Sequence, residues 1–370
     1  MAISSTGSDA ARAPPAAPAV TRLLVVDDSA LMRKILRDLF SDTGRYEVQT
    51  ARNGADALQQ IERFNPDVVT LDVNMPEMDG LTCLSHIMAR FPRPVVMISS
   101  ITQKGAQVTL EALALGAVDF VGKPGGTVLL EIDAVANDIL GKVDAARHAR
   151  PGMARAIASA TRSRVEAAAP KARPGQTGRP IGGLVLIGVS TGGPRTLEDI
   201  LPLLPATFPW PVVVAQHMPA AFTGSFAARL DGLCALHVQE VSAPTPLAQG
   251  NVYIARGSGD VVVERMLGRP IAKSVAEDDA FCWHPSVGKL VASAMRAMEP
   301  RTLVGVQLTG MGDDGARAMA DLCKAGGRTI AEDSSTAVVF GMPGELIRLG
   351  GATRVLPSDR VADQLNSWIL

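Results

Sequence analysis

The segment LVLIGVSTGG, residues 184–193, predicts the fold of the second half of the chain. Its apolar run, Leu184–Ile187, leads into a turn in which Gly188 and Gly192 flank Ser190. A buried strand, a glycine-bracketed serine and a helix-compatible stretch together expose a hydroxyl on a sharp turn beside backbone N–H groups. We therefore expect Ser190 at the carboxyl end of a strand in a parallel α/β sheet, where its G-x-S-x-G turn makes it a candidate nucleophile.

Strand-like and helix-like stretches alternate on both sides of this turn. In the C-terminal half, apolar runs recur at Leu184–Ile187, Pro211–Ala215, Val252–Ile254, Leu303–Leu308 and Thr329–Ala331. In the N-terminal half, they recur at Leu23–Val26, Asp67–Leu71, Pro94–Ile98 and Phe120–Val121. Between these lie stretches with apolar positions at helical spacing, at Leu31–Phe40, Ala55–Phe64, Leu81–Arg90 and Val108–Leu115. Such alternation is typical of doubly wound parallel sheets.

Length and local composition divide the chain into segments. A chain of 370 residues usually forms about two or three domains. Residues 1–20 are rich in Ala, Pro and Ser and are predicted to be a disordered tail rather than a signal peptide. Residues 146–180 are predicted to be a linker, since they are dominated by Ala, Arg, Pro, Gly and Ser. We expect two doubly wound α/β domains, at residues 21–145 and 181–370.

Composition also excludes several function classes. The net charge of -1 gives no global attraction to nucleic acid, and the C-terminal half lacks the basic stripe of a DNA-binding domain. No apolar segment approaches the roughly 18 residues that span a bilayer, so no direct membrane insertion is expected. The 4 cysteines show neither CxxC pairing nor the spacing of a disulfide framework. Buried thiols in a reducing cytosol are therefore favoured over a metal site, and we expect a cytoplasmic protein.

Acidic, hydroxyl and basic side chains follow successive predicted strands of the N-terminal half. They are Asp27 and Asp28, Asp72, Ser99 and Lys123, in that order. Because the carboxyl ends of parallel strands form one crevice, we expect these side chains to meet there. Three carboxylates in one crevice repel one another and invite a hard cation, of which Mg²⁺ is the usual partner of phosphate chemistry. Taken singly, each acid can equally be a helix N-cap, but the whole set in this order favours a phosphate site.

The stretch from residue 22 to about residue 140 resembles the response-regulator receiver domain. The resemblance implies that Asp72 accepts a phosphoryl group from a histidine kinase. The other roles that it implies are Mg²⁺ binding by Asp27 and Asp28 together with Asp72, switching by Ser99 and Phe120, and contact with phosphoryl oxygens by Lys123.

A serine hydroxyl becomes a good nucleophile only when a base removes its proton and a third group orients that base. His217 follows the run Pro211–Ala215 at a strand's carboxyl end, as Ser190 follows its own strand. His237 lies inside an apolar run and is expected to be structural, whereas His284 lies in a loop that can border a site. The orienting acid is expected in LTGMGDDG, residues 308–315, which again follows a strand. The chain order Ser, His, Asp differs from the Ser, acid, His order of α/β-hydrolases.

Four motifs in the C-terminal half are similar to those of the CheB family, the chemotaxis protein-glutamate methylesterases. They are STGG at 190–193, QHMP at 216–219 with the Phe222–Ala227 segment behind it, TGMGDDG at 309–315 and GMP at 341–343. Together with the receiver, the resemblance covers nearly the whole chain from Arg22 onward.

By motif, the resemblance implies a catalytic triad of Ser190 as nucleophile, His217 as general base and Asp314 as the orienting acid. Asp313 occupies the variable position before the matching aspartate. Thr191 and the backbone N–H of Met311 are expected at the active centre, the latter in the oxyanion hole.

The activity that this resemblance implies is phosphorylation-regulated hydrolysis of glutamyl methyl esters on chemoreceptors, with deamidation of receptor glutamines, in bacterial chemotaxis adaptation. It needs Mg²⁺ in the receiver and no cofactor for the esterase step. One alternative is a non-catalytic response regulator that docks to receptors or signalling partners, which the intact Ser/His/Asp set argues against. A second is a nucleotide-binding output domain. The sequence argues against this second alternative, because it has no acid at a strand end about 20 residues after the Ser190 turn, as a dinucleotide site would need, and no Gly-Lys-Ser/Thr motif.

Three segments depart from the family pattern. Arg256 and then SGD at 258–260 replace the usual Pro and later His, and HPSVG at 284–288 replaces Arg-Pro-Ser-Val-Asp. The usual Gln-Asp-Glu is EDS at 332–334. We expect these segments to border the substrate groove without touching the triad, and so to affect receptor preference rather than reaction type.

Overall fold

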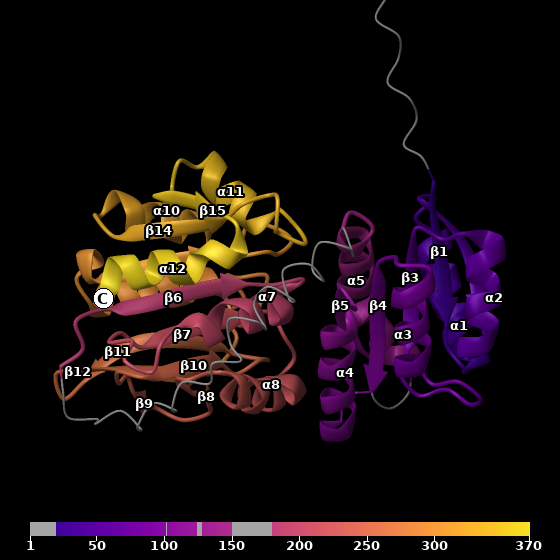
Figure 1. Ribbon diagram of the computed structural model, residues 1–370, viewed down its shortest axis with the longest axis horizontal. Helices are drawn as coiled ribbons and strands as arrows, with labels where there is room; N and C mark the ends of the chain where they lie inside the picture. Colours follow the sequence, from indigo (N-terminus) through magenta and orange to yellow (C-terminus); the bar gives the residue numbers. More distant parts are fainter. Residues whose placement is uncertain (1–19, 101, 124–127, 150–179) are drawn as a thin grey trace, which may run out of the picture.

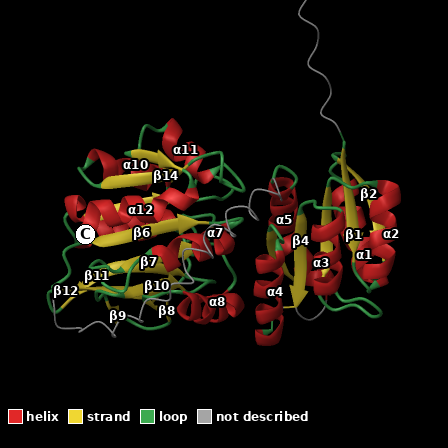
Figure 2. Ribbon diagram, viewed as in Figure 1, coloured by secondary structure: helices red, strands yellow, loops and turns green. Residues whose placement is uncertain are grey.

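The computed structural model describes residues 20–100, 102–123, 128–149 and 180–370. These residues form two parallel sheets with helices on both faces, together with a small antiparallel sheet (Figures 1 and 2). The prediction of two doubly wound α/β domains is therefore confirmed.

The first sheet has five parallel strands in the order β2-β1-β3-β4-β5. They are β1 (Thr21–Val26), β2 (Tyr46–Ala51), β3 (Val68–Asp72), β4 (Val95–Ser100) and β5 (Asp119–Lys123). The helices are α1 (Ala30–Ser41), α2 (Gly54–Phe64), α3 (Gly80–Arg90), α4 (Gln103–Leu115) and α5 (Val128–Ala146). This strand order creates a crevice between the carboxyl ends of β1 and β3, where doubly wound sheets hold their ligands.

Strand β2 has no counterpart among the predicted apolar runs. It lies at an edge of the sheet, and its sequence YEVQTA places buried Tyr46 and Ala51 at its ends and an exposed Glu47 between them. A strand with one wet face carries alternating rather than continuous hydrophobicity. The strands that were predicted are covered on both faces, as in β3, whose five residues are all buried.

Side-chain caps begin four of the helices that follow these strands. Ser29, Asn53, Asp79 and Thr102 each accept the backbone N–H of the third residue after them, at the starts of α1 to α4. Such caps satisfy N–H groups that a helix leaves unpaired. Because Ser29 caps α1, neither Asp27 nor Asp28 fills the N-cap position that was the alternative role for them.

The second sheet has seven parallel strands in the order β15-β14-β13-β6-β7-β10-β8. They are β6 (Leu184–Val189), β7 (Val212–Gln216), β8 (His237–Val241), β10 (Asn251–Ala255), β13 (Leu303–Gln307), β14 (Arg328–Glu332) and β15 (Arg354–Leu356). The helices are α7 (Gly193–Ile200), α8 (Ala220–Leu233), α9 (Val287–Ala297), α10 (Ala316–Lys324), α11 (Met342–Arg348) and α12 (Ser358–Ile369). Ser190 follows the central strand β6, at the carboxyl edge of the sheet.

The two faces of this sheet pack against different helices. Val185 and Ile187 of β6 belong to the core that also contains apolar residues of α7, α8 and α12. Leu184 and Leu186 point to the opposite core, which is shared with α9, α10 and α11. The alternation along one strand thus divides the helices into two layers.

A three-stranded antiparallel sheet, β11-β12-β9, was not predicted. It comprises β9 (Thr245–Pro246), β11 (Asp260–Met266) and β12 (Arg269–Val275). It is joined to the domain through α9, where the Ser293 hydroxyl oxygen accepts the Val263 N–H at 3.0 Å. The sheet places Asp260 beside the loop that precedes α9.

The two domains are in direct contact. Helix α4 packs against α7 and α8 of the second domain (Figure 1). The rings of Phe120 in β5 and Phe222 in α8 have centroids 4.4 Å apart. Arg195 of α7 donates from Nη1 to the carbonyl oxygen of Ala114 at the end of α4, at 3.1 Å. The receiver face that carries β5, α4 and α5 therefore covers the start of α7 and α8.

The predicted tail at residues 1–20 lies outside the described residues, apart from Val20. Of the predicted linker at 146–180, residues 150–179 lie outside them as well. Within the described part of the chain, no helix is long and apolar enough to cross a bilayer.

Candidate active site

Ser190 occupies the turn between β6 and α7. Its backbone N–H donates to the Thr309 carbonyl oxygen at 2.9 Å, and its own carbonyl oxygen accepts the Gly193 N–H at 2.8 Å. Gly192 has a left-handed backbone, with φ of 79°, which disfavours a side chain there. Gly310 must lack one because a Cβ at that position would lie 2.7 Å from the Cβ of Ser190. The glycines thus let two loops close around the hydroxyl.

His217 follows β7, the strand next to β6. Its Nδ1 lies 3.1 Å from Ser190 Oγ, and its Nε2 lies 2.9 Å from Asp314 Oδ2. A carboxylate can only accept, so Nε2 carries the proton, and the neutral ring presents an unprotonated Nδ1 to the serine. A hydroxyl whose proton faces an oriented, unprotonated imidazole is the arrangement that activates serine as a nucleophile.

Asp314 lies in the loop between β13 and α10 and is buried. Four donors converge on its carboxylate. Oδ2 accepts from His217 Nε2 at 2.9 Å and from the Val287 N–H at 2.7 Å. Oδ1 accepts from the Ser286 hydroxyl at 3.1 Å and from the Gly288 N–H at 3.0 Å.

These donors decide the charge of Asp314. Burial alone would raise its pKa, but hydrogen bonding and the charge of His217, with the backbone N–H groups of Gly288 and Val287, outweigh it. The pKa of Asp314 therefore lies below its usual value, and the acid is ionised wherever His217 works as a base.

One expectation about the departing segments is wrong. The 284–288 segment was expected not to touch the triad, yet Gly288, together with Ser286 and Val287, donates directly to Asp314. The segment is held in turn by Asp260, whose Oδ1 accepts the Ser286 N–H at 2.7 Å. These contacts join backbone groups at the start of α9 to a loop far along the chain, so no local motif announces them.

Gln216 is a supporting residue that sequence reasoning did not single out. It precedes His217, is buried, and donates from Nε2 to the carbonyl oxygens of Ser190 at 3.0 Å and His217 at 3.1 Å. One amide therefore joins the serine turn to the histidine turn. The QHMP motif contains this residue, but its spacing does not show that the side chain points back along the sheet.

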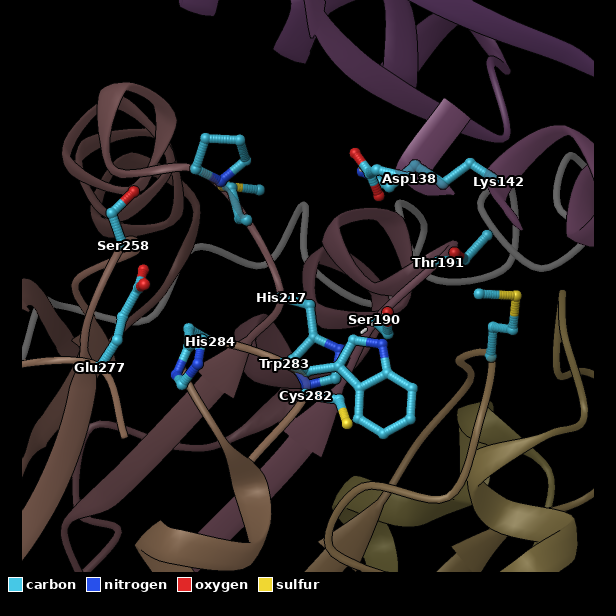
Figure 3. A pocket seen from close by; sticks show the side chains of 13 residues that line it. Asp138, Lys142, Ser190, Thr191, His217, Ser258, Glu277, Cys282, Trp283 and His284 are labelled. Carbon is cyan, nitrogen blue, oxygen red and sulfur yellow. Dashed lines mark hydrogen bonds and ion pairs between the residues drawn. The ribbon is translucent and has the colours of Figure 1, made fainter. Parts of the chain in front are cut away.

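A cavity of about 300 Å³ opens beside Ser190 and His217 (Figure 3). Thr191, Met311, Trp283 and His284 are among the residues that line it. The rings of His217 and Trp283 are nearly parallel, at 2°, with centroids 6.1 Å apart. The predicted place of Thr191 at the active centre and the predicted oxyanion role of the Met311 N–H remain predictions, although both residues lie at the cavity.

The other two candidate histidines lie apart from the triad. His284 lies in a loop that borders the cavity, as its sequence context suggested. Its Nδ1 lies 2.9 Å from Oδ1 of the fully buried Asp260. His237 opens β8, where its Nδ1 lies 2.9 Å from Asp231 Oδ1.

The carboxyl edge of the first sheet brings the predicted acids together. Oxygen atoms of Asp27, Asp28 and Asp72 lie within 4.8 Å of one another, with the first and last of these residues buried. Lys123 Nζ lies 2.9 Å from Asp27 Oδ2 and 2.9 Å from Asp72 Oδ2. Burial raises the pKa of Asp72, and the charge of Lys123 offsets part of this effect. Three converging carboxylates and one ammonium leave a net negative, all-oxygen site, which fits a hard divalent cation.

The two predicted switch residues lie on neighbouring strands. Ser99 of β4 is fully buried and pairs in register with Gly122 of β5, with its Oγ 3.5 Å from the Gly105 carbonyl oxygen. Phe120 of β5 is also buried, but its ring packs on Phe222 of the second domain. The aromatic position thus lies in the domain interface.

The receiver also reaches the cavity. Asp138 and Lys142 of α5 line it (Figure 3), and Lys142 Nζ donates to the Phe120 carbonyl oxygen at 2.7 Å. The buried carboxylate of Asp119 is hydrogen-bonded by the side chain of Thr191, the residue next to Ser190. Two residues of one domain therefore border the candidate site of the other, and a third contacts it directly.

Comparison with known proteins agrees with these two centres. The family model described as "CheB methylesterase" matches residues 185–365, and the "Response regulator receiver domain" model matches residues 23–132. A protein-glutamate methylesterase/protein-glutamine glutaminase of Rhodospirillum rubrum is 54% identical over 95% of this chain and 96% of its own. A second, of Rhodopseudomonas palustris, is 51% identical over 94% of this chain and 98% of its own. The crystal structure of the Thermotoga maritima CheB catalytic domain is 39% identical and covers 51% of this chain and 99% of that one, with a TM-score of 0.49.

Proposed function

The chain belongs to the CheB family, and from that premise we propose that it is a phosphorylation-regulated protein-glutamate methylesterase that acts on chemoreceptors in bacterial chemotaxis adaptation. The observation that carries this proposal is the contact series Ser190 Oγ, His217 Nδ1, His217 Nε2 and Asp314 Oδ2, with separations of 3.1 and 2.9 Å. It lies beside a cavity large enough for an extended side chain.

In the proposed reaction, Ser190 Oγ attacks the carbonyl carbon of a glutamyl methyl ester while its proton passes to His217 Nδ1. The tetrahedral intermediate collapses when His217 returns that proton to the methoxy oxygen, and methanol leaves. Water then attacks the acyl-enzyme with His217 again as the base, which frees the receptor glutamate and restores Ser190. Asp314 keeps the proton of His217 on Nε2 and stabilises the imidazolium in both steps.

The oxyanion of each intermediate needs donors on the side away from His217. We assign this role to backbone N–H groups at Thr191 and Met311, which border the cavity from two different loops. The same machinery acts on a side-chain amide with ammonia as the leaving group. Deamidation of receptor glutamines is therefore a second activity of the same site, in line with the glutaminase name of the Rhodospirillum rubrum relative.

We further propose that the unphosphorylated receiver restrains this site. Three contacts support it: Asp119 with Thr191, Phe120 with Phe222, and α5 with the cavity. Asp72 is the proposed phosphoacceptor, with a histidine kinase as the donor. A new charge at Asp72 would draw Lys123 and Ser99 toward it and disturb β5, which carries both interface residues.

Asp27, Asp28 and Asp72 are the residues that would hold Mg²⁺. When bound, this cation neutralises charge on the incoming phosphoryl group. Lys123 already bridges two of these acids and is placed to contact the phosphorylated side chain.

The domain boundaries that we propose are 21–145 for the receiver, 146–180 for the linker and 181–370 for the catalytic domain, after a tail at 1–20. A protein that works on the cytoplasmic helices of receptors is expected to act in the cytoplasm.

The decisive test is release of volatile methanol from receptor membranes that carry radiolabelled methyl esters. The wild type is expected to release methanol, faster with a small phosphodonor and Mg²⁺, and Ser190→Ala to release none above background. Equal release by both proteins would contradict the mechanism. Receptor binding without methanol release by the wild type would favour a docking regulator instead. If phosphodonor does not change the rate of the wild type, and Asp72→Asn has the same rate, control by the receiver is rejected.

A further inference from the structure

Glu332 is a fully buried carboxylate that the proposed reaction does not use. It ends β14, next to β13, and each of its oxygens has one partner. Oε2 accepts the Thr309 N–H at 2.8 Å, and Oε1 accepts the Thr336 hydroxyl at 2.9 Å. The Thr336 oxygen in turn accepts the Ser358 N–H at 2.9 Å. These partners are all uncharged, so they satisfy the hydrogen bonds of the carboxylate without balancing its charge.

Thr309 connects this carboxylate to the nucleophile turn. Its carbonyl oxygen accepts the Ser190 N–H at 2.9 Å, and its hydroxyl donates to the Thr191 carbonyl oxygen at 2.9 Å. Thr309 also begins the loop that carries Met311. Thr309 therefore links Glu332 to the Ser190 N–H and to Thr191, and it lies two residues before Met311.

The surroundings of Glu332 disfavour its ionised form. Burial is the largest effect and raises its pKa to about 7, although the bonds from Thr309 and Thr336 act in the opposite direction. Two acids raise it further: Asp333, the next residue, and Asp199 of α7, whose own charge is partly balanced by Arg195 at 3.6 Å. The group thus changes charge close to neutral pH.

We infer that Glu332 is a positioning residue for the nucleophile turn and that the enzyme turns over faster when this side chain is neutral. The inference rests on the proposed function, because it concerns the same reaction. A neutral carboxyl keeps both contacts, with Oε2 accepting from Thr309 and Oε1–H donating to Thr336. The ionised form keeps them too, but it adds a buried negative charge close to the site where the negative oxyanion must form.

The test compares the full-length wild type with Glu332→Gln, in which the amide has the shape and the hydrogen-bonding pattern of the neutral acid. The rate of methanol release at saturating methylated receptor is measured from about pH 6 to about pH 9. The ratio of variant to wild-type rate cancels the ionisations that both proteins share. We expect this ratio to rise from about one at the acid end to roughly tenfold at the alkaline end, the order of effect of one buried charge on another at an effective dielectric near 20 when a single residue lies between them. KM is expected to stay unchanged.

Asp333→Asn is the matched control, because it removes the adjacent acid while an amide oxygen can still accept the Ser335 N–H. Its ratio to wild type is expected to return to one at both ends of the range, with only a shallow dip between them, because loss of the neighbouring charge lowers the pKa of Glu332 without removing its ionisation. A flat ratio for Glu332→Gln, at any value, would overturn the inference, because a purely structural loss does not follow an ionisation. If the wild type itself releases no methanol, the proposed function fails, which is a separate outcome from a flat ratio.

Discussion

Replacing Asp314 with asparagine tests the geometry of the triad most sharply, since it replaces one carboxylate oxygen with an NH₂ group and changes almost no volume. In the native protein, four hydrogen-bond donors point at this carboxylate, two at each oxygen. A carboxylate accepts all of them, whereas an amide offers only one accepting oxygen. Whichever way the amide turns, its NH₂ group must therefore face two donors.

Either orientation places the NH₂ group against one fixed backbone N–H and one partner that can adapt. Ser286 can rotate its hydroxyl and His217 can change tautomer, but the N–H groups of Val287 and Gly288 are fixed. If the NH₂ group faces His217, Nε2 becomes the acceptor, and the ring proton moves to Nδ1, where it points at Ser190 Oγ. A ring in this tautomer cannot act as the base. Loss of the correct tautomer in a serine triad costs about 10⁴ in kcat, or about 5.5 kcal/mol of transition-state stabilisation.

The assay is methanol release from methylated receptor membranes in the presence of phosphodonor. Asp314→Asn is expected to lower kcat about 10⁴-fold with a small change in KM, because the acid does not touch the substrate. Asp313→Asn is the matched control, since Asp313 is exposed and its contact in this turn, with the Ala316 N–H, uses the backbone carbonyl. A variant of Asp314 that keeps more than about a tenth of the wild-type kcat would refute the reasoning about tautomers.

Three further outcomes follow from the same contacts. Glu332→Gln is expected to raise the free energy of unfolding at pH 8 by up to about 3 kcal/mol, and to have little effect near pH 4. The reason is that the folded-state pKa of about 7 exceeds the ordinary 4.5, so this acid destabilises the fold as pH rises between those values. Denaturant titration followed by tryptophan fluorescence measures this change in the catalytic domain, which holds all 3 tryptophans, and equal stabilisation at both pH values would contradict it. Asp119→Asn is expected to raise the basal, unphosphorylated methanol rate several-fold, because it weakens the bond to Thr191 and the pairing with Lys142; an unchanged basal rate with an intact phosphodonor response would exclude this contact from the restraint. Asp27→Asn is expected to weaken Mg²⁺-dependent phosphorylation of Asp72 at least tenfold while leaving basal methanol release in place, and phosphorylation that remains Mg²⁺-dependent at the wild-type level would argue against the cation site.

The sequence predicts the parts of this fold that are buried on both faces. Leu184–Ile187 and Leu23–Val26 are continuous apolar runs because parallel central strands lie between two helical layers. Edge strand β2 and the antiparallel pair β11 and β12 escape this criterion, since each has side chains in water. Hydrophobic runs therefore locate the centre of each sheet better than its margins.

The candidate triad was predictable for a related reason. Ser190, His217 and the 308–315 loop each follow a central parallel strand, and the carboxyl ends of such strands converge. The choice of Asp314 within that loop came from the resemblance to the CheB family. The groups that hold Asp314 in place were not predictable, because Val287 and Gly288 contribute backbone N–H groups, which any residue possesses. Spacing locates the side chains that react, while the contacts that orient them depend on how distant loops pack.

The contact between the domains has no signature in either half alone. Phe120 and Phe222 are each ordinary core-forming residues of their own domain, and only the packed structure pairs them at 4.4 Å. The restraint that this interface would impose also depends on Asp119, which reads in the sequence as the first residue of a strand. The proposed restraint thus rests on a contact between domains that motifs do not show, although Phe120 itself was predicted as a switch residue from the family resemblance.

The central claim is that Ser190 attacks a receptor methyl ester under the control of Asp72. One measurement tests it most directly: the initial rate of labelled methanol release from methylated receptor membranes, with and without phosphodonor and Mg²⁺, for the wild type and Ser190→Ala. We predict a basal wild-type rate that rises with phosphodonor and a rate at background for Ser190→Ala in both conditions. Methanol release by Ser190→Ala that still responds to phosphodonor would contradict the account.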